Sequence, residues 1–177
     1  MQAISYSYNS KELRNMYATL LANSMNKDTQ DTVHPAFVEL IKQLSPLEAQ
    51  ILKKLYDNIE YTISYPLVKL RSTISEVDNT GIDRIEHILN SDFGVNIFNI
   101  DKYILAIDNL YRLNLISVTY ISRFSDISKY ESIESSDLFH DIKQKCNNMP
   151  NLNFLQVIRG KFDITSLGIA FISACVS

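Results

Sequence analysis

The chain has 177 residues, of which 46% are hydrophobic and 21% are charged, as in an ordinary soluble globular protein. This length allows one sizeable core, or two small units that share one. Seventeen Lys and Arg residues against twenty Asp and Glu residues give a net charge of −3 and a pI of about 5.6. The balance excludes a globally basic nucleic-acid binder, although it leaves local basic patches open.

The sequence carries no signal for secretion, membrane insertion or metal binding by cysteine. Cys146 and Cys175 are far apart and fit no metal-binding or redox spacing. The longest apolar run, Ile169 to Val176, is much shorter than the roughly 20 residues that span a bilayer. The N-terminus lacks the basic and apolar regions of a signal peptide. We therefore expect a cytoplasmic protein with buried thiols.

Three helices are predicted in the first third of the chain. Apolar residues between positions 13 and 21 recur at the spacing of one helix face, after Asn9 or Ser10 as the N-cap. A polar loop follows, and Pro35 begins a short second helix because proline suits the first helical position. Residues 45–48, SPLE, begin the third, since the serine can cap it and the glutamate can bond back to the cap.

The middle of the chain combines extended and helical patterns. Large apolar or aromatic residues alternate with polar ones at the start of residues 61–73, which favours a strand. Pro66 would confine this strand to a sheet edge or a bend. Isoleucines and a leucine over residues 82–89 predict a short helix. A longer helix opens near residue 99 and continues to residue 112, and an alternating strand follows at residues 117–121.

The last third begins with a polar excursion between two strands. Residues 122–153 are rich in Ser, Asp and Asn and hold a predicted short helix near residues 137–146. Residues 155–163 favour another strand, with Gly160 as an expected bulge. Thr165 is the expected cap of a closing helix.

Beyond the first 44 residues, this order of helices and strands resembles a winged helix. Leu110–Ile116 is similar to the exit from the third helix of that fold, and Phe162–Gly168 is similar to the segment after its wing. The resemblance implies a mostly α (α+β) protein. An N-terminal helical pair, residues 1–44, would pack on a winged-helix-like domain with a small antiparallel sheet, residues 45–177. The excursion over about 122–153 would be an insertion, too long for an ordinary wing.

A second resemblance lies at the start of the chain. Glu12 to Asn26 reads ELRNMYATLLANSMN, and Val33 to Ala49 reads VHPAFVELIKQLSPLEA. These segments resemble the shared pattern of Abi-alpha, a family of bacterial proteins linked to abortive infection. The resemblance implies a role in phage defence but no chemistry. It also implies that this chain is the C-terminal part of a longer protein, because relatives carry a segment ahead of the first helix.

No catalytic or cofactor motif is found. Four glycines build neither a phosphate loop nor a dinucleotide fingerprint, and a nucleophile elbow is absent. The predicted helix over 82–89 would bring Asp83, Glu86 and His87 together, which leaves a general-base site as a third hypothesis beside an ordinary exposed pair. His140 and Cys146 lack further ligands nearby, so no metal is expected. We expect a non-enzymatic protein without a cofactor.

Two binding hypotheses follow. A DNA-binding winged helix would use its third helix and wing, which supply Lys102, Arg112, Arg159 and Lys161 as candidate contacts. Aspartates on the same helix balance its charge, so DNA is not the favoured partner.

The tyrosines offer the other hypothesis, because tyrosine is enriched at protein interfaces as well as in aromatic cores. Tyr6, Tyr8, Tyr61 and Tyr65 are the candidate interaction surface. The sequence therefore favours a non-enzymatic protein-interaction module of an abortive-infection protein, with a winged-helix DNA-binding protein as the alternative. Its partner would be another protein or the N-terminal segment that relatives carry, and homo-oligomerisation stays open.

Overall fold

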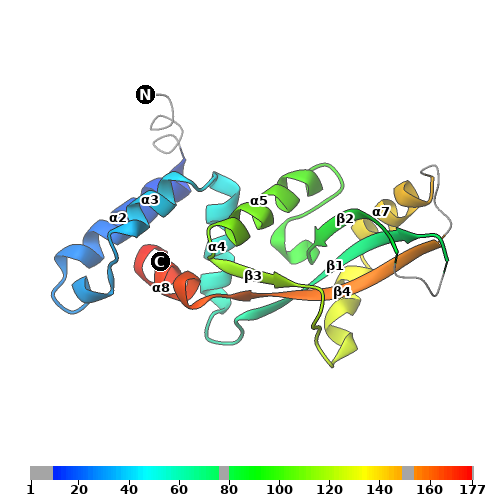
Figure 1. Ribbon diagram of the computed structural model, residues 1–177. Helices are drawn as coiled ribbons and strands as arrows, with labels where there is room; N and C mark the ends of the chain where they lie inside the picture. The colour runs from blue at the N-terminus through cyan, green and yellow to red at the C-terminus, as the bar shows by residue number, and fades with distance from the viewer. Residues whose placement is uncertain (1–9, 76–79, 149–153, 177) are drawn as a thin grey trace. The chain divides into compact units, whose positions relative to one another are not determined.

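The computed structural model describes residues 10–75, 80–148 and 154–176, which form a mixed α+β fold (Figure 1). The chain divides into two compact units. The first combines the chain before Ser64 with residues 106–117 and the segment from residue 164 onward. The second combines residues 64–105 with residues 118–163. The prediction of an α+β protein with an antiparallel sheet is confirmed.

Most predicted elements are present. The helices are α2 (Lys11–Met25), α3 (Ala36–Lys42), α4 (Pro46–Asn58), α5 (Ile100–Arg112), α6 (Glu131–Glu134), α7 (Asp137–Asn147) and α8 (Ser166–Cys175). The strands are β1 (Ser64–Thr73), β2 (Gly81–Ile88), β3 (Ile116–Thr119) and β4 (Phe154–Ile164). Short 3₁₀ turns are η1 (Gln30–Thr32), η2 (Ser91–Phe93) and η3 (Ile127–Tyr130). No helix of these described segments is both long enough and apolar enough to cross a membrane.

The first unit is a helical core, to which α2, α3, α4 and α8 contribute. Helices α2 and α8 begin at the predicted caps: Ser10 accepts a bond from the start of α2, and Thr165 does the same for α8. The rings of Phe37 and Phe171 meet edge to face, with centroids 5.4 Å apart. Buried apolar side chains of this core include Leu13, Met16, Leu20, Phe37, Ile41, Leu52, Leu55 and Phe171.

A buried carboxylate joins two helices of the first unit. Glu48 is only 4% exposed. Its Oε2 atom accepts the backbone N–H of Ser45 at 2.8 Å, while Ser45 Oγ accepts the N–H of Glu48, so the predicted capping box is confirmed. The same Oε2 also accepts from Nδ2 of Asn109 on α5 at 2.8 Å. The start of α4 and the end of α5 are therefore held by one side chain.

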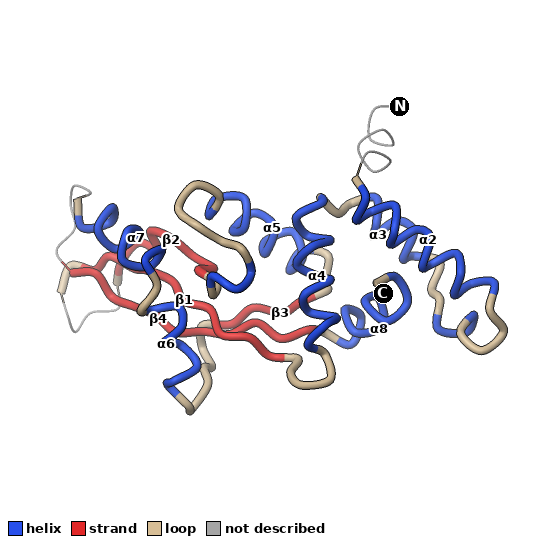
Figure 2. The backbone as a smooth tube through the Cα atoms, turned by 180° about the vertical axis from the view of Figure 1, so that it is seen from behind, coloured by secondary structure: helices blue, strands red, loops and turns tan. Residues whose placement is uncertain are grey.

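The second unit is built on an antiparallel sheet with the strand order β2-β1-β4-β3, drawn in red in Figure 2. β1 pairs with β4 without interruption from Ser64–Asp163 to Thr73–Phe154. β1 pairs with β2 over a shorter stretch, from Val68–Ile88 to Thr73–Gly81. β1 therefore lies inside the sheet.

The prediction of a short helix over residues 82–89 is wrong, because this segment is strand β2. The cause is an extra residue in the strand. Val68 lies opposite Ile88 and Leu70 opposite Ile85, so two steps along β1 match three along β2. His87 takes up the bulge with a positive φ of 56°. The bulge brings Ile85 and Ile88 to one face at a spacing of three, which imitates a helix.

Two further strand predictions need correction. Pro66 does not place β1 at a sheet edge, since β1 has neighbours on both sides, but β2 pairing starts only at Val68, beyond the proline. Gly160 is not a bulge, because its register with β1 is unbroken. A side chain at Gly160 would instead collide with the Thr119 carbonyl and the Tyr120 ring. Glycine is needed there for close approach of the chain.

The polar excursion folds over one face of the sheet in the second unit. Alternation along β1 and β4 places Val68, Leu70 and Arg159 on that face. Glu134 at the end of α6 binds Arg159, and Tyr130 Oη donates to the Gly160 carbonyl at 2.9 Å. Apolar side chains of the excursion that are buried here include Tyr130, Ile133, Leu138, Phe139, Ile142 and Cys146. The opposite face carries the charged residues of β1.

We expect Glu48→Ala to lower the free energy of unfolding by about 1–3 kcal/mol, because it removes both the cap bond to the Ser45 N–H and the bond from Asn109 Nδ2. Urea denaturation measures the loss. Glu39→Ala is the control, since the carboxylate of Glu39 makes an exposed ion pair with Lys42 on α3. Equal losses in the two variants would contradict the role given to Glu48.

Candidate functional site

The face of the sheet opposite the polar excursion, in the second unit, holds an ionic network between β1 and β2. Lys69 Nζ lies 2.7 Å from Asp83 Oδ2 and 3.5 Å from Glu86 Oε1. Arg71 Nε lies 2.8 Å from Asp83 Oδ1. Burial raises the pKa of Asp83, but the hydrogen bond and charge of Lys69, with the charge of Arg71, outweigh it and hold that pKa below its ordinary value. Asp83 is thus an ionised partner of two cations.

Next to this network, His87 is hydrogen-bonded to Tyr120. His87 is 8% exposed, and its backbone N–H donates to Tyr120 Oη at 3.0 Å. Its ring nitrogen Nδ1 is also 3.0 Å from Tyr120 Oη. Tyr120 Oη therefore accepts the backbone N–H of His87 and is also hydrogen-bonded to its ring, in a direction set by the imidazole tautomer. Lys69 Nζ lies 4.5 Å from the centre of the Tyr120 ring.

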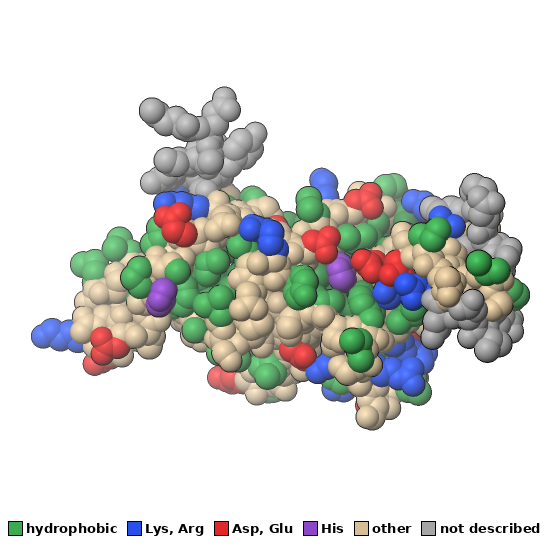
Figure 3. Space-filling model, viewed as in Figure 1, with side chains coloured by type: hydrophobic (Ala, Val, Ile, Leu, Met, Phe, Trp, Pro, Cys, Tyr) green, Lys and Arg blue, Asp and Glu red, His purple; other side chains and the backbone are tan. Residues whose placement is uncertain are grey.

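The structure therefore places the predicted trio Asp83, Glu86 and His87 on strand β2 rather than on a helix. Asp83 and Glu86 share Lys69, whereas His87 binds Tyr120. Figure 3 shows acidic and basic side chains gathered together over β1 and β2. Within the described segments, no three His, Cys, Asp or Glu side chains converge as ligands for a metal ion.

The four candidate nucleic-acid contacts lie in different settings. Arg159 makes a two-pronged ion pair with Glu134, with Nη2 2.8 Å from Oε2, and Lys161 pairs with Asp163 at 2.8 Å. Three of the four belong to the second unit.

The remaining pair lies on helix α5. Lys102 is exposed near its start. Arg112, in the first unit, donates to Asn109 Oδ1 at 2.8 Å and to Gln43 Oε1 at 3.2 Å. Within the described residues, Lys102 is the one member of this set whose side chain makes no hydrogen bond or ion pair.

The candidate tyrosines also lie in different surroundings. Tyr6 and Tyr8 lie outside the described residues. Tyr61 is 84% exposed and belongs to the first unit. Tyr65, in the second unit, stacks on Phe162 with centroids 5.0 Å apart, and its burial raises the pKa of the phenol. Tyr65 is therefore a member of an aromatic cluster, whereas Tyr61 is a surface residue.

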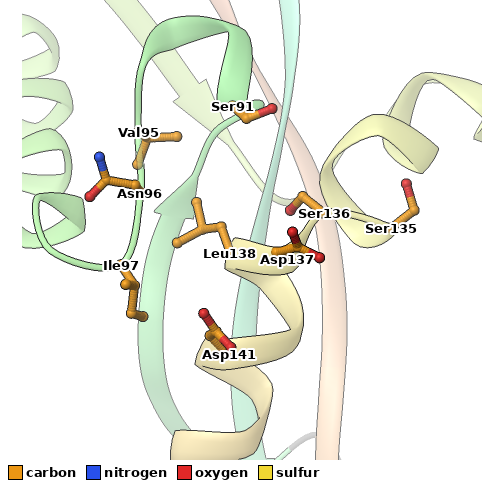
Figure 4. Close-up of a pocket in the computed structure, with 9 residues that line it drawn as sticks. All are labelled: Ser91, Val95, Asn96, Ile97, Ser135, Ser136, Asp137, Leu138 and Asp141. Carbon is orange, nitrogen blue, oxygen red and sulfur yellow. The ribbon is translucent and has the colours of Figure 1, made fainter.

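A pocket of about 450 Å³ opens in the second unit between the loop after η2 and the start of α7 (Figure 4). Leu138 and Asp141 of α7 face the loop that carries Val95, Asn96 and Ile97. The pocket thus has aliphatic walls and carboxylates. Its other lining residues are Ser91, Ser135, Ser136 and Asp137.

The loop beside this pocket presents an aromatic side chain to solvent. Phe98 is 94% exposed. Asn96 Oδ1 accepts the N–H of Phe98 at 2.9 Å, Asn99 Oδ1 accepts the N–H of Asn96 at 2.7 Å, and Asn99 Nδ2 donates to the Gly94 carbonyl at 3.1 Å. Three bonds therefore fix a short loop around one exposed phenylalanine. This loop was not predicted from the sequence, although the closely spaced Asn96 and Asn99 are a signal for it.

Comparison with known families gives a context for these surfaces. The model of the family described as abortive infection alpha matches residues 1–175, nearly the whole chain. This chain belongs to the abortive infection alpha family. The resemblance read from the N-terminal segments is thus confirmed, and the protein is related to abortive infection.

Other comparisons add little to the abortive infection alpha assignment. No curated protein matches the chain. A solved structure of an uncharacterized protein from the hydrocarbon-degrading marine bacterium Alcanivorax borkumensis SK2 has 20% sequence identity and a TM-score of 0.45. That match covers 76% of this chain and 87% of the other.

The pKa of Asp83 yields a prediction for this abortive infection alpha protein. A folded-state pKa below the unfolded value means that ionised Asp83 stabilises the fold at neutral pH, and that this contribution is lost as pH falls through the folded-state pKa. We expect Asp83→Asn to lower the free energy of unfolding by about 1–2 kcal/mol at pH 7 and to flatten its decline below about pH 4. Urea unfolding from pH 7 to pH 2 measures both effects.

The control is Asp141→Asn, because Asp141 is exposed on α7. We expect its pH profile to match that of the unmodified protein. A steep acid loss that persists unchanged in Asp83→Asn would contradict the assigned pKa direction.

Proposed function

We propose that this chain is a non-enzymatic protein-interaction module that acts in phage defence by recognising another protein. The observation that carries the proposal is the exposure of Phe98 on a loop fixed by Asn96 and Asn99. A large aromatic side chain presented to solvent by a hydrogen-bonded loop is suited to anchor an interface. Burying it would contribute about 1.5–3 kcal/mol.

The rest of the surface supports the same proposal. Because the loop is already fixed, little conformational entropy is lost when a partner binds. The pocket of Figure 4 lies beside it, and its combination of Leu138 with Asp137 and Asp141 suits an aliphatic side chain that ends in a positive charge. A partner segment with a basic residue next to an apolar one would fit both features.

The catalytic candidates predicted from the sequence are bound by other side chains, and this supports a non-enzymatic role. Asp83 is held by Lys69 and Arg71, and His87 is held by Tyr120. In these contacts the charged groups support the sheet. A general base would instead need an acceptor turned toward a substrate.

The partner can be identified by replacing Phe98 with the photoreactive residue benzoylphenylalanine in cells. We expect one discrete protein adduct on irradiation, because the side chain would lie inside the interface. A band at twice the mass of the chain would identify a second copy of this protein as that partner. The double substitution Asp137→Asn, Asp141→Asn should reduce the yield by removing the charges of the neighbouring pocket.

Ile82 provides the control position, since it is 62% exposed on β2 in the same unit. The same photoreactive residue at position 82 should give no matching adduct. Equal adducts at the two positions, or none at position 98, would count against the proposal.

The winged-helix DNA-binding alternative has weaker support. The second unit holds ten basic and twelve acidic residues, and two of its candidate contacts, Arg159 and Lys161, pair with carboxylates. Phosphate neutralisation by unpaired cations supplies most non-specific DNA affinity.

A labelled duplex titrated with the protein tests that alternative by fluorescence anisotropy. We expect no binding with a Kd of about 10 μM or tighter even at low salt, where electrostatic attraction is greatest. Tight binding that weakens with salt, and that is lost when Lys102, Arg112, Arg159 and Lys161 are replaced by alanine, would favour the DNA-binding function.

A further inference from the structure

The sheet has a strand edge that its neighbour covers only in part. β4 runs over eleven residues, Phe154–Ile164, whereas β3 has four, Ile116–Thr119. Among the described strands, β4 has β1 on one side and β3 on the other. Figures 1 and 2 show β4 continuing beyond the end of β3. The first half of β4 is therefore an edge.

The direction of the backbone groups at this edge follows from two hydrogen bonds at the C-terminal end of β4. The N–H of Ile164 donates to the Ile63 carbonyl at 2.8 Å, on the β1 side. The next N–H, that of Thr165, donates to the Leu115 carbonyl at 3.1 Å, on the β3 side. Backbone groups of successive strand residues point to opposite sides, so odd-numbered residues of β4 face β3.

The register of β4 against β1 is unbroken from Phe154 to Asp163. The alternation therefore holds along the strand, and the N–H and C=O groups of Val157 and Arg159 point to the edge that lies beyond Thr119. These are the groups that would pair with an added strand.

Beside this edge lies a second pocket, of about 460 Å³. It is lined by four consecutive residues of β4, Gln156–Arg159, together with Tyr120, Ile121 and Arg123. Alternate side chains of a strand point to opposite faces, so four successive residues can border one pocket only where it follows the strand edge. The pocket has the position of the next strand in the sheet.

The charge of the pocket selects its occupant. Arg123 and Arg159 are basic, and no acidic residue is present among the described residues that line it. Arg159 already binds Glu134. Arg123 is exposed and forms no ion pair with any residue in the described segments. Carboxylates on an incoming segment would complement Arg123.

The other edge of the sheet is unlike this one. β2 has two register shifts in its pairing with β1, between Val68 and Leu70 and between Leu70 and Arg71. Bulges of this kind twist an edge and prevent regular pairing, which is a common way to protect it. β4 has no such interruption, and its regular edge is therefore the one suited to strand addition.

We infer that the β4 edge at Val157 and Arg159 binds an extended acidic segment of a partner protein as an added β-strand. Main-chain hydrogen bonds to these two residues would supply affinity, and carboxylates near Arg123 would supply selectivity. The inference shares with the proposed function only the idea of protein recognition. It uses none of the residues of the Phe98 loop, so either can fail without the other.

Hydrogen exchange by NMR tests the inference with two capped octapeptides, one alternating Val and Glu and the other alternating Val and Lys. At saturation with the Val–Glu peptide, we expect exchange of the Val157 and Arg159 amides to slow at least tenfold. The Ile158 amide, which faces β1, is the internal reference and should not change. The Val–Lys peptide should give no protection.

A charge reversal makes the test sharper. Arg123→Glu should weaken the Val–Glu peptide at least tenfold, and the exposed position of Arg123 keeps the fold intact. Lys143→Glu on α7 makes the same change in net charge away from the pocket and should leave the affinity unchanged. Equal affinity for both peptides, or no protection at Val157 and Arg159, would overturn the inference. Displacement of the Val–Glu peptide by duplex DNA would also overturn it, in favour of a phosphate-binding surface.

Discussion

The pairing of β1 with β4 is the constraint on which the second unit depends. Its register runs unbroken from Ser64–Asp163 to Thr73–Phe154 and joins segments that are far apart in the sequence. Because side chains alternate along a strand, this single register decides that Lys69 and Arg71 share one face while Val68 and Leu70 share the other. A slip of one residue would bury the charged network and expose the apolar face.

Local chemistry was enough to predict most helices, since their start signals act within three residues. The capping box at Ser45 needs no knowledge of the rest of the chain. Strand β2 could not be recognised in this way. Its bulge at His87 arises because three steps along β2 pair with two steps along β1. This mismatch depends on both strands and cannot be read from one of them. Gly160 was likewise misread, because its close contact with Thr119 and Tyr120 comes from a distant segment.

The same limit applies to the candidate site residues, whose types can be read from the sequence but whose surroundings cannot. Basic residues could be identified from the sequence as possible contacts for phosphate, but their partners could not. Arg159 and Glu134 are 25 positions apart, and Arg112 and Gln43 are 69 positions apart. Exposure is equally non-local, so the sequence around Phe98 did not show that its ring is exposed while that of Phe162 is buried. The two asparagines around Phe98 indicate a fixed turn, yet only the surrounding structure determines that its aromatic ring lies in water.

The position of the family pattern explains why recognition of the family gives a context without a chemistry. Residues 12–26 and 33–49 lie in α2, α3 and the start of α4 of the first unit. Phe37 and Ile41 of this pattern are buried, and Glu48 ties α4 to α5. These residues stabilise the helical core of the first unit. Both surfaces proposed for recognition, the Phe98 loop and the β4 edge, belong to the second unit. Substitutions there can change the partner without disturbing the core that carries the family pattern.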